Sequence, residues 1–197
     1  MNNDILYLAS ASPRRQELLT AAGIPFELTK HFFDEHSVEQ NVSPKDFATY
    51  VAMGKAASLS DHSEFDSRYI LGVDTIVAFN GQILGKPENA IIAEQNIRRM
   101  SGQWHEVISG IAIVNREKNI FYKTSCTSKV KFAELSDRFI DYYIRENHWQ
   151  GFAGGYAIQQ LFSLVVERIE GSYTNIVGLP METLYIMLND IGFRMKM

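Results

Sequence analysis

The sequence predicts an α/β fold built on one mixed β-sheet. Apolar runs of strand length alternate with segments that carry helix start and stop signals, but the alternation is irregular. A hairpin signal, Asn80-Gly81, joins two of the apolar runs in the middle of the chain. Because a strict βαβ repeat has no such hairpin, we expect parallel and antiparallel strand pairs in one sheet. With 197 residues, 46% of them hydrophobic, we expect a single domain over residues 1–197.

The first half of the chain is predicted to hold two strand–helix pairs. Ser12 and Pro13 suit the cap and the first turn of a helix, and Gly23 suits its end. Ser43 and Asp46 repeat the start signal before a second helical segment. The expected elements are strands at residues 5–9 and 26–29 and helices at 12–23 and 43–57, with loops at 32–35 and 61–68.

The second half is predicted to hold the longest strands. Residues 69–79 are strongly β-like, and Asn80-Gly81 is typical of a type I′ turn into a shorter strand. Ser136 suits the cap of an amphipathic helix. The expected elements are strands at 69–79, 82–84, 105–115, 120–132 and 164–169, and helices at 88–100, at 136–144 and from 180 onward.

Charge and cysteine content exclude several classes of function. The formal charge of −4 gives no general attraction to nucleic acid or to an anionic membrane, so we expect neither as a partner. The single Cys126 excludes an intrachain disulfide and fits a reducing compartment. The first residues lack the features of a signal peptide, and no run approaches the ~20 apolar residues of a membrane span. We therefore expect a cytoplasmic protein.

The stretch Leu8-Ala9-Ser10-Ala11-Ser12-Pro13-Arg14-Arg15 is the first candidate site. It combines serine hydroxyls, the N–H groups of a helix N-terminus and two guanidinium groups, a set of donors that suits phosphate. Arg14 and Arg15 oppose the helix macrodipole by ~0.3–1 kcal/mol each, so a bound anion would explain them. The alternative is a pair of solvated arginines balanced by Glu17 or by a distant carboxylate.

Asp74 is the second candidate, because it interrupts the apolar run of residues 70–77. A lone carboxylate is costly to bury, so Asp74 lies either at a site near a strand end or beside a structural partner. Since carboxylates with a perturbed pKa gather where chemistry occurs, the site is the favoured interpretation.

Three further charged residues are weak signals one by one. Lys55 lies on a predicted helix and Glu35 in a predicted loop, where each is by default solvated, and Lys86 lies in a constrained turn. Together with Asp74 and the two arginines, they suit a metal-assisted reaction on a polyphosphate, because Mg²⁺ takes one or two protein carboxylates and substrate oxygens. The five histidines form no HExxH or other metal-ligand spacing. Composition and spacing do not by themselves gather the charged residues into one pocket.

Eight short motifs follow one another along nearly the whole chain. They are LASASPRRQELL at 8–19, Phe33-Asp34-Glu35, Lys55-Ala56, Gly72-Val73-Asp74-Thr75, Gly85-Lys86-Pro87, Ser101-Gly102, Gly155-Tyr156-Ala157-Ile158-Gln159, and Gly171-Ser172-Tyr173 to Val177-Gly178-Leu179-Pro180. Each motif is weak by itself, but eight in this order are specific. In this order they resemble the motifs of the Maf family of nucleoside triphosphate pyrophosphatases.

The resemblance implies an elongated α/β structure, similar to the inosine triphosphate pyrophosphatases, with a cleft between two lobes. It implies a nucleotide diphosphatase that cleaves nucleoside triphosphates to the monophosphate and pyrophosphate, with Mg²⁺ or Mn²⁺ as cofactor. Asp74 would be the proton acceptor, and Glu35 and Asp74 would hold the metal. An ordinary aspartate, with a pKa of ~3.9, is a weak base at neutral pH, so Asp74 would also act by orienting water. The triphosphate would be bound by Ser10, Arg14, Arg15, Lys55 and Lys86.

Three positions carry what the resemblance implies about the base. In the branch of the family that favours dTTP and UTP, Arg follows the Ser-Pro pair, Thr follows the catalytic Asp, and Gln lies in a GAYGIQG segment. This chain has Arg14, Thr75 and Gln159 at these positions. A branch that favours 7-methyl-GTP has Trp at the first of them. The resemblance thus implies a house-cleaning enzyme for dTTP, UTP and modified pyrimidine nucleotides.

One segment departs from that branch's GKAGAYGIQG pattern. Residues 151–160 read GFAGGYAIQQ, so Phe152 replaces a lysine, and Ala157 and Gln160 replace glycines. Because this segment carries Gln159, base preference is less well determined than reaction type. Two alternatives stay open: the same reaction on another base, such as a guanine derivative, and a nucleotide-binding regulator of cell division with little turnover. The resemblance also implies a homodimer, for which no segment of the chain shows a contact face.

Overall fold

The computed structural model describes residues 4–38, 42–60 and 62–195. A seven-stranded sheet runs through it, and its strands are β1 (Leu6–Leu8), β2 (Phe26–Leu28), β3 (Tyr69–Phe79), β4 (Gln82–Leu84), β5 (Trp104–Asn115), β6 (Ile120–Phe132) and β7 (Val166–Glu170). The order is β2-β1-β3-β5-β6-β7, with β4 paired to β3. β1 pairs in parallel with β2 and β3, and the other pairs are antiparallel. The predicted mixed α/β sheet is confirmed.

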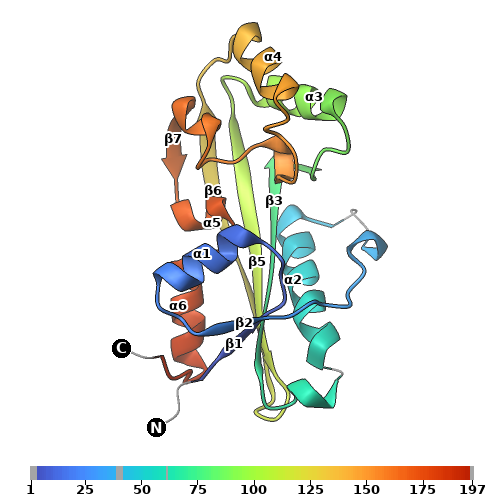
Figure 1. The fold of residues 1–197 in the computed structure, drawn as a ribbon, viewed down its shortest axis with the longest axis vertical. Helices are drawn as coiled ribbons and strands as arrows, with labels where there is room; N and C mark the ends of the chain where they lie inside the picture. Colours follow the sequence, from blue (N-terminus) through green and yellow to red (C-terminus); the bar gives the residue numbers. More distant parts are fainter. Residues whose placement is uncertain (1–3, 39–41, 61, 196–197) are drawn as a thin grey trace.

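The helices lie around three long strands. They are α1 (Pro13–Ala21), α2 (Pro44–Ser60), α3 (Ala90–Met100), α4 (Asp137–Arg145), α5 (Tyr173–Val177) and α6 (Met181–Asp190), with short 3₁₀ turns η1 (Glu35–Ser37), η2 (Ser63–Phe65), η3 (Ala153–Gly155) and η4 (Leu161–Leu164). β3, β5 and β6 follow the long axis of the molecule, with α3 and α4 at one end and α1, α2 and α6 around the other half (Figure 1). None of the helices in the described ranges is long and apolar enough to cross a membrane.

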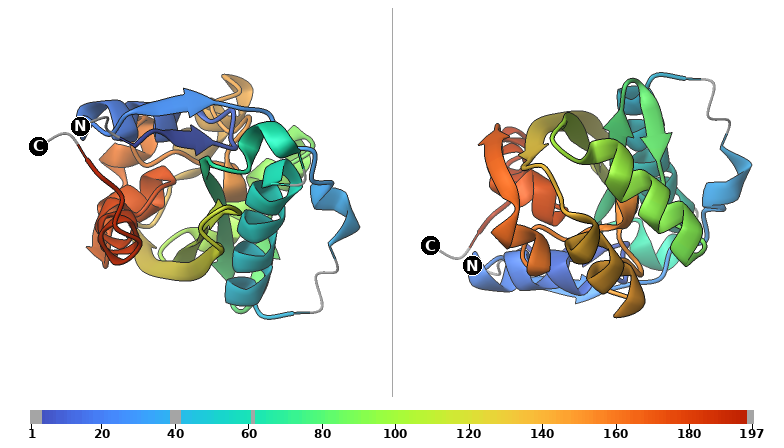
Figure 2. Two further views of the ribbon diagram at one scale, coloured as in Figure 1. Left: turned by 90° about the horizontal axis from the view of Figure 1, so that it is seen from below. Right: turned by 90° about the horizontal axis from the view of Figure 1, so that it is seen from above.

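The two faces of β3 bury different helices. Ile70 packs with the small residues of α2, including Ala52, whereas Leu71 packs with Leu184 of α6. The end-on views show α2 and α6 on opposite sides of the sheet (Figure 2). Because side chains alternate along a strand, successive residues of β3 point to opposite faces. Further along β3, any two neighbouring polar residues therefore reach different surroundings.

Two glycines let α2 lie unusually close to the sheet. A Cβ on Gly72 of β3 would lie 2.1 Å from the carbonyl oxygen of Ala52, and one on Gly110 of β5 would lie 2.1 Å from that of Ala48. Any larger residue would push the helix away, since backbone atoms cannot yield. This close approach brings the middle of α2 within side-chain reach of β3.

The helix and hairpin start signals in the first half of the chain are largely confirmed. Ser43 caps α2, where its Oγ accepts the N–H of Asp46 at 3.2 Å. Asn80 and Gly81 have φ of 50° and 77°, the positive values that a type I′ hairpin requires. Ser12 occupies the N-cap position of α1, but its side chain makes no capping bond. The N-terminus of α1 therefore has no side-chain cap.

Two strand and helix starts lie two residues later than expected, and two short elements were not expected. α3 begins at Ala90 and not at residue 88, because Asn89 caps it by accepting the N–H of Ile92 at 3.0 Å. β7 begins at Val166, since Leu164 still belongs to η4. α5 was not predicted, and the polar loop at 61–68 contains η2 within its described residues. Both are short elements with little room for a periodic apolar pattern.

An aromatic core supports the segment that departs from the family pattern. Phe132 and Phe162 are fully buried and contact the ring of Tyr156, which lies at right angles to that of His105, and buried Tyr143 packs against Phe162. The Tyr156 hydroxyl and His105 Nε2 are 2.7 Å apart, and burial lowers the pKa of His105 to about 3. The buried Tyr156 side chain thus fixes the position of the backbone around it.

Candidate active site

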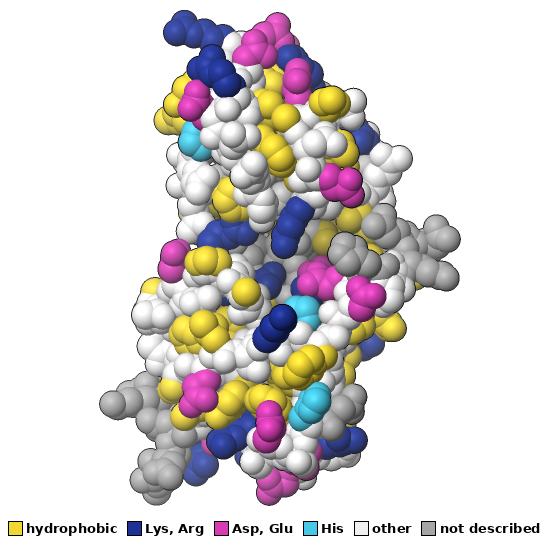
Figure 3. Space-filling model, turned by 45° about the vertical axis from the view of Figure 1, so that its right-hand side comes forward, with side chains coloured by type: hydrophobic (Ala, Val, Ile, Leu, Met, Phe, Trp, Pro, Cys, Tyr) yellow, Lys and Arg dark blue, Asp and Glu magenta, His cyan; other side chains and the backbone are white. Residues whose placement is uncertain are grey.

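The nine residues that the sequence analysis assigned to catalysis, binding and specificity all line one cavity of about 780 Å³. It is bounded by the β1–α1 turn, the middle of β3, α2 and the segment 150–160. Figure 3 shows a hollow on this face, with basic side chains around it and acidic ones at one side. The nine are Ser10, Arg14, Arg15, Glu35, Lys55, Asp74, Thr75, Lys86 and Gln159.

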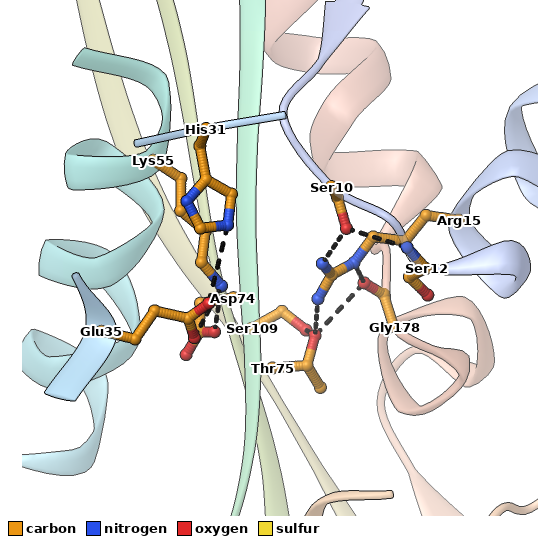
Figure 4. A network of polar contacts seen from close by, with 10 residues as sticks. All are labelled: Ser10, Ser12, Arg15, His31, Glu35, Lys55, Asp74, Thr75, Ser109 and Gly178. Carbon is orange, nitrogen blue, oxygen red and sulfur yellow. Dashed lines mark hydrogen bonds and ion pairs between the residues drawn. The ribbon is translucent and has the colours of Figure 1, made fainter. Parts of the chain in front are cut away.

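Lys55 joins two carboxylates on one side of β3. Its Nζ donates to Oδ1 of Asp74 at 2.8 Å and lies 3.0 Å from Oε2 of Glu35 (Figure 4). Asp74 is only 8% exposed and Lys55 only 5%, so a solvated lysine is the wrong interpretation of Lys55. The sequence left two interpretations of Asp74, a site residue or a residue with a structural partner. Asp74 both lines the cavity and is hydrogen-bonded to Lys55, so the two interpretations hold together.

Glu35 is the most exposed member of the group formed by Lys55, Asp74 and Glu35. Its side chain is 45% exposed, and His31 Nε2 lies 3.6 Å from its Oε1. Burial by itself would raise the pKa of Glu35, but attraction and hydrogen bonding to Lys55, with help from His31 and Lys86, lower that pKa below its ordinary value. Burial and the nearby Lys55 also lower the pKa of His31. Glu35 is therefore an accessible carboxylate that stays ionised into mild acid.

Arg15 lies on the other side of β3, and its hydrogen-bond partners among the described residues are all neutral. Its Nη1 donates to Ser10 Oγ at 2.7 Å, its Nη2 to Thr75 Oγ1 at 3.1 Å, and its Nε to the Gly178 carbonyl at 2.8 Å (Figure 4). The residue is 8% exposed, and burial lowers its pKa to about 10 against the attraction of Asp74. Arg15 is neither solvated nor paired directly with a carboxylate, and its guanidinium joins three separate chain segments.

The hydrogen bonds of Arg15 continue into the core through Thr75. Oγ1 of Thr75 lies 2.8 Å from Oγ of Ser109 on β5, which in turn contacts the carbonyl of Asn175. The Asn175 amide donates to Ser128 Oγ and to the carbonyl of Val107, both at 2.9 Å. Thr75 is thus part of a buried framework that ties β3, β5, β6 and α5 together.

The remaining predicted residues lie at the rim of the cavity. Lys86 and Gln159 are exposed, and Arg14 is half-buried with its Cζ 4.4 Å from the centroid of the Phe152 ring. Arg14 makes no ion pair or hydrogen bond with the residues that the structure describes, so the predicted balance by Glu17 is limited to long-range attraction. The rim therefore offers two cations and an amide to a ligand.

The carboxylates of Asp74 and Glu35, on the side of β3 that faces α2, form a donor set that fits a divalent cation. We call this side of the cavity the acidic side. Asp74 and Glu35 already share one cation, the ammonium of Lys55, so their oxygens converge on a positive charge. Across the described residues, no three His, Cys, Asp or Glu side chains form a metal-binding group. Mg²⁺ suits such a pair, because it takes one or two carboxylates and fills its other positions with waters and phosphate oxygens.

Comparison with known proteins identifies the family of this chain. The profile of the Maf family, described as Maf-like protein, matches residues 5–191. This chain belongs to the Maf family. A protein of Clostridium novyi (strain NT) named dTTP/UTP pyrophosphatase is 42% identical over 188 residues, covering 94% of this chain and 96% of that protein. A protein of the same name from Geobacter sp. (strain M21) is 41% identical over 192 residues and covers 98% of each chain.

A solved structure adds a more distant likeness to this Maf chain. The crystal structure of a nucleoside-triphosphatase / dITP/XTP pyrophosphatase from Mycobacterium abscessus covers 95% of this chain and 97% of its own, with a TM-score of 0.48 and 16% identity. The assignment of the fold rests on the strand order of the sheet described above.

Several residues around the site of this Maf protein were given no role from the sequence. His31 lies four residues before Glu35, and this spacing to a candidate ligand was its only signal. Ser109 and Asn175 lie in ordinary apolar or polar runs, and Gly178 contributes a backbone carbonyl. A carbonyl acceptor has no sequence signature, because every residue carries one.

Proposed function

We propose that this Maf protein is a nucleotide diphosphatase that hydrolyses dTTP and UTP to the monophosphate and pyrophosphate, with Mg²⁺ or Mn²⁺. The observation that carries the proposal is the cavity itself, which is lined both by two carboxylates joined through Lys55 and by the cationic side chains of Arg14, Arg15 and Lys86. A triphosphate needs cations along its length and one carboxylate near its reacting phosphorus. The names of relatives at about 40% identity support the same reaction and the same bases.

The reaction requires one water and one proton acceptor. The water oxygen forms a bond to the α-phosphorus, while the bond from this phosphorus to the oxygen bridging the α- and β-phosphates breaks. The electron pair of the broken bond leaves with pyrophosphate, and Asp74 accepts the water proton. Lys55 keeps the Asp74 carboxylate oriented through its 2.8 Å hydrogen bond. A divalent cation held by Asp74 and Glu35 would neutralise phosphate charge.

The cations differ in how they can serve the triphosphate. Lys86 and Arg14 are at the rim with free donors and suit the charge of the leaving pyrophosphate or the base. Three of the five N–H groups of Arg15 are already used by protein oxygens, so we propose that Arg15 contacts phosphate with the other two while holding Ser10 in place. For the base, the exposed Gln159 amide can donate to and accept from a pyrimidine edge.

A substrate panel tests this function. Purified protein is incubated with Mg²⁺ or Mn²⁺ and each common ribo- and deoxyribonucleoside triphosphate, and the products are identified. We expect pyrophosphate and monophosphate, formed fastest from dTTP and UTP. Orthophosphate with a nucleoside diphosphate would refute the bond assignment, and faster cleavage of a guanine nucleotide would refute the base assignment. Tight binding without turnover would instead indicate a nucleotide-binding regulator.

A further inference from the structure

Arg14 and Phe152 meet across the mouth of the cavity. Arg14 lies in the first turn of α1, and Phe152 lies 138 positions later in the chain, just before η3. The guanidinium carbon is 4.4 Å from the centroid of the phenyl ring, and both residues line the cavity. This geometry is a cation–π contact, in which the negative face of the ring attracts the guanidinium.

The ring is what fixes the Arg14 guanidinium. Nε of Arg14 is buried and has no hydrogen-bond partner in the described part of the chain. Glu17, one turn along the same helix, attracts Arg14 only at long range. This contrasts with Arg15, which three protein oxygens hold in place. Without the ring, the Arg14 side chain would keep its rotamer freedom, because an unpaired arginine on a helix surface has several open conformations.

The backbone that follows Phe152 is fixed by hydrogen bonds. The N–H of Gly154 donates to the carbonyl of Gly85 at 3.0 Å, and that of Gly155 donates to the carbonyl of Phe152 at 3.0 Å. Gly154 has φ of 66°, and a Cβ there would lie 3.0 Å from the side chain of Val77. The segment therefore lies close to β3, and its backbone holds the Phe152 ring in position beside Arg14.

We propose that Phe152 is a specificity-determining positioning residue, whose ring holds the Arg14 guanidinium at the base-binding end of the cavity. The inference rests on the proposed function and deepens it. The negative face of the phenyl ring attracts the guanidinium of Arg14 and limits the conformations open to it. A guanidinium held there can donate its N–H groups to the carbonyl oxygens that uracil and thymine carry on their edges.

The first test replaces the ring and measures base selectivity. Phe152→Leu removes the π face but keeps an apolar side chain, and Phe152→Tyr keeps the ring. We expect Phe152→Leu to raise KM for UTP and dTTP by about five- to tenfold with kcat within about twofold of the parent. The ratio of kcat/KM for UTP to that for GTP should fall by the same factor. Phe152→Tyr should restore both quantities, and Phe121→Leu on exposed β6 is the matched control.

The second test asks whether the ring acts through Arg14. In an Arg14→Gln background, Phe152→Leu should have no further effect on KM, because the guanidinium that the ring positions is gone. An equal rise in KM in both backgrounds would overturn the proposal, since the ring would then contact the base directly. A change in thermal midpoint without a change in KM would also overturn it, because the contact would then be structural only.

The outcomes separate this inference from the proposed function. If the parent cleaves another nucleotide fastest, the assignment of dTTP and UTP fails, and the same variants are compared on that nucleotide. If the parent binds without turnover, calorimetric titration with UTP replaces KM as the readout. In either case coupling between residues 14 and 152 supports the positioning role, and additive effects refute it.

Discussion

Asp74 and Thr75 are neighbours on β3, yet they belong to two polar groups of opposite character. On the side of α2, Asp74 shares Lys55 with Glu35, so every member is charged and one carboxylate is accessible. On the side of α1, Thr75 shares Arg15 with Ser10 and the Gly178 carbonyl, so the partners of this buried cation in the described part of the chain are neutral (Figure 4).

This difference in charge and exposure indicates which of the two sides of β3 can rearrange when a ligand binds. An accessible carboxylate can exchange an ammonium for another cation at little cost, because water and the ligand replace what it loses. A buried guanidinium cannot leave its acceptors without exposing unpaired polar groups, each worth about 1–3 kcal/mol. We therefore expect the α2 side to carry the chemistry and the α1 side to carry the framework.

The largest effect is expected from Asp74→Asn, which keeps the shape and removes the proton acceptor. We expect kcat to fall about 10³-fold, in the range that general-base catalysis contributes, while UTP still binds. Steady-state kinetics and calorimetric titration measure the two quantities. Asp141→Asn, at an exposed position on α4, is the control. Unchanged turnover in the Asp74 variant would show that the acidic side is not the reactive one.

Arg15→Lys is the strongest test of the framework side. Lysine keeps the charge but cannot reach all three acceptors, so we expect the free energy of unfolding to fall by about 2–3 kcal/mol. Urea denaturation followed by circular dichroism gives the value. The same substitution at exposed Arg168 on β7 should be close to neutral. Equal stability of the two variants would mean that Arg15 is not a structural tie.

Thr75→Val asks how much of that framework depends on one hydroxyl. The valine leaves Arg15 and Ser109 without their shared partner, and we expect a loss of about 1 kcal/mol in the free energy of unfolding. Thr75→Ser keeps the hydroxyl and should recover most of it. If serine and valine destabilise equally, the methyl group and not the hydrogen bonds of Thr75 matters.

The smallest effect is a pH dependence confined to the acidic side. The pKa of Glu35 is lower in the folded chain than its ordinary value of 4.5, so ionised Glu35 stabilises the fold above about pH 4.5. This contribution is lost as the pH falls through the folded-state pKa. Because Glu35 is half-exposed, screening limits it to a few tenths of a kcal/mol. In metal-free buffer, Glu35→Gln should flatten the acid limb of the stability curve, and an unchanged limb would contradict the ion pair.

Much of this molecule could be predicted before its structure was known. The long strands were found almost to the residue, because a run such as 69–79 is apolar on both faces and bounded by turn signals. The Asn80-Gly81 turn was found because few residue pairs tolerate two positive φ values. The family and the nine cavity residues followed from ordered motifs. The short α5 was not predicted, and the start of α3 was placed two residues too early, since local caps decide such ends.

The sequence by itself was enough to select nine residues that line one cavity, whereas only the tertiary structure decided what each of them touches. Arg14 and Arg15 are the same residue type at adjacent positions. Because a helix turns about 100° per residue, Arg14 faces the rim of the cavity and Arg15 faces the core. The roles assigned to them, base selection for Arg14 and phosphate binding for Arg15, stay predictions.

Lys55 shows the same division. Its charge was visible in the sequence, but its burial between Asp74 and Glu35 depends on the close approach of α2 to Gly72 and on a loop that returns beside β3. These contacts join residues that are distant in the chain. Local propensity therefore cannot specify them, and packing of the whole sheet does.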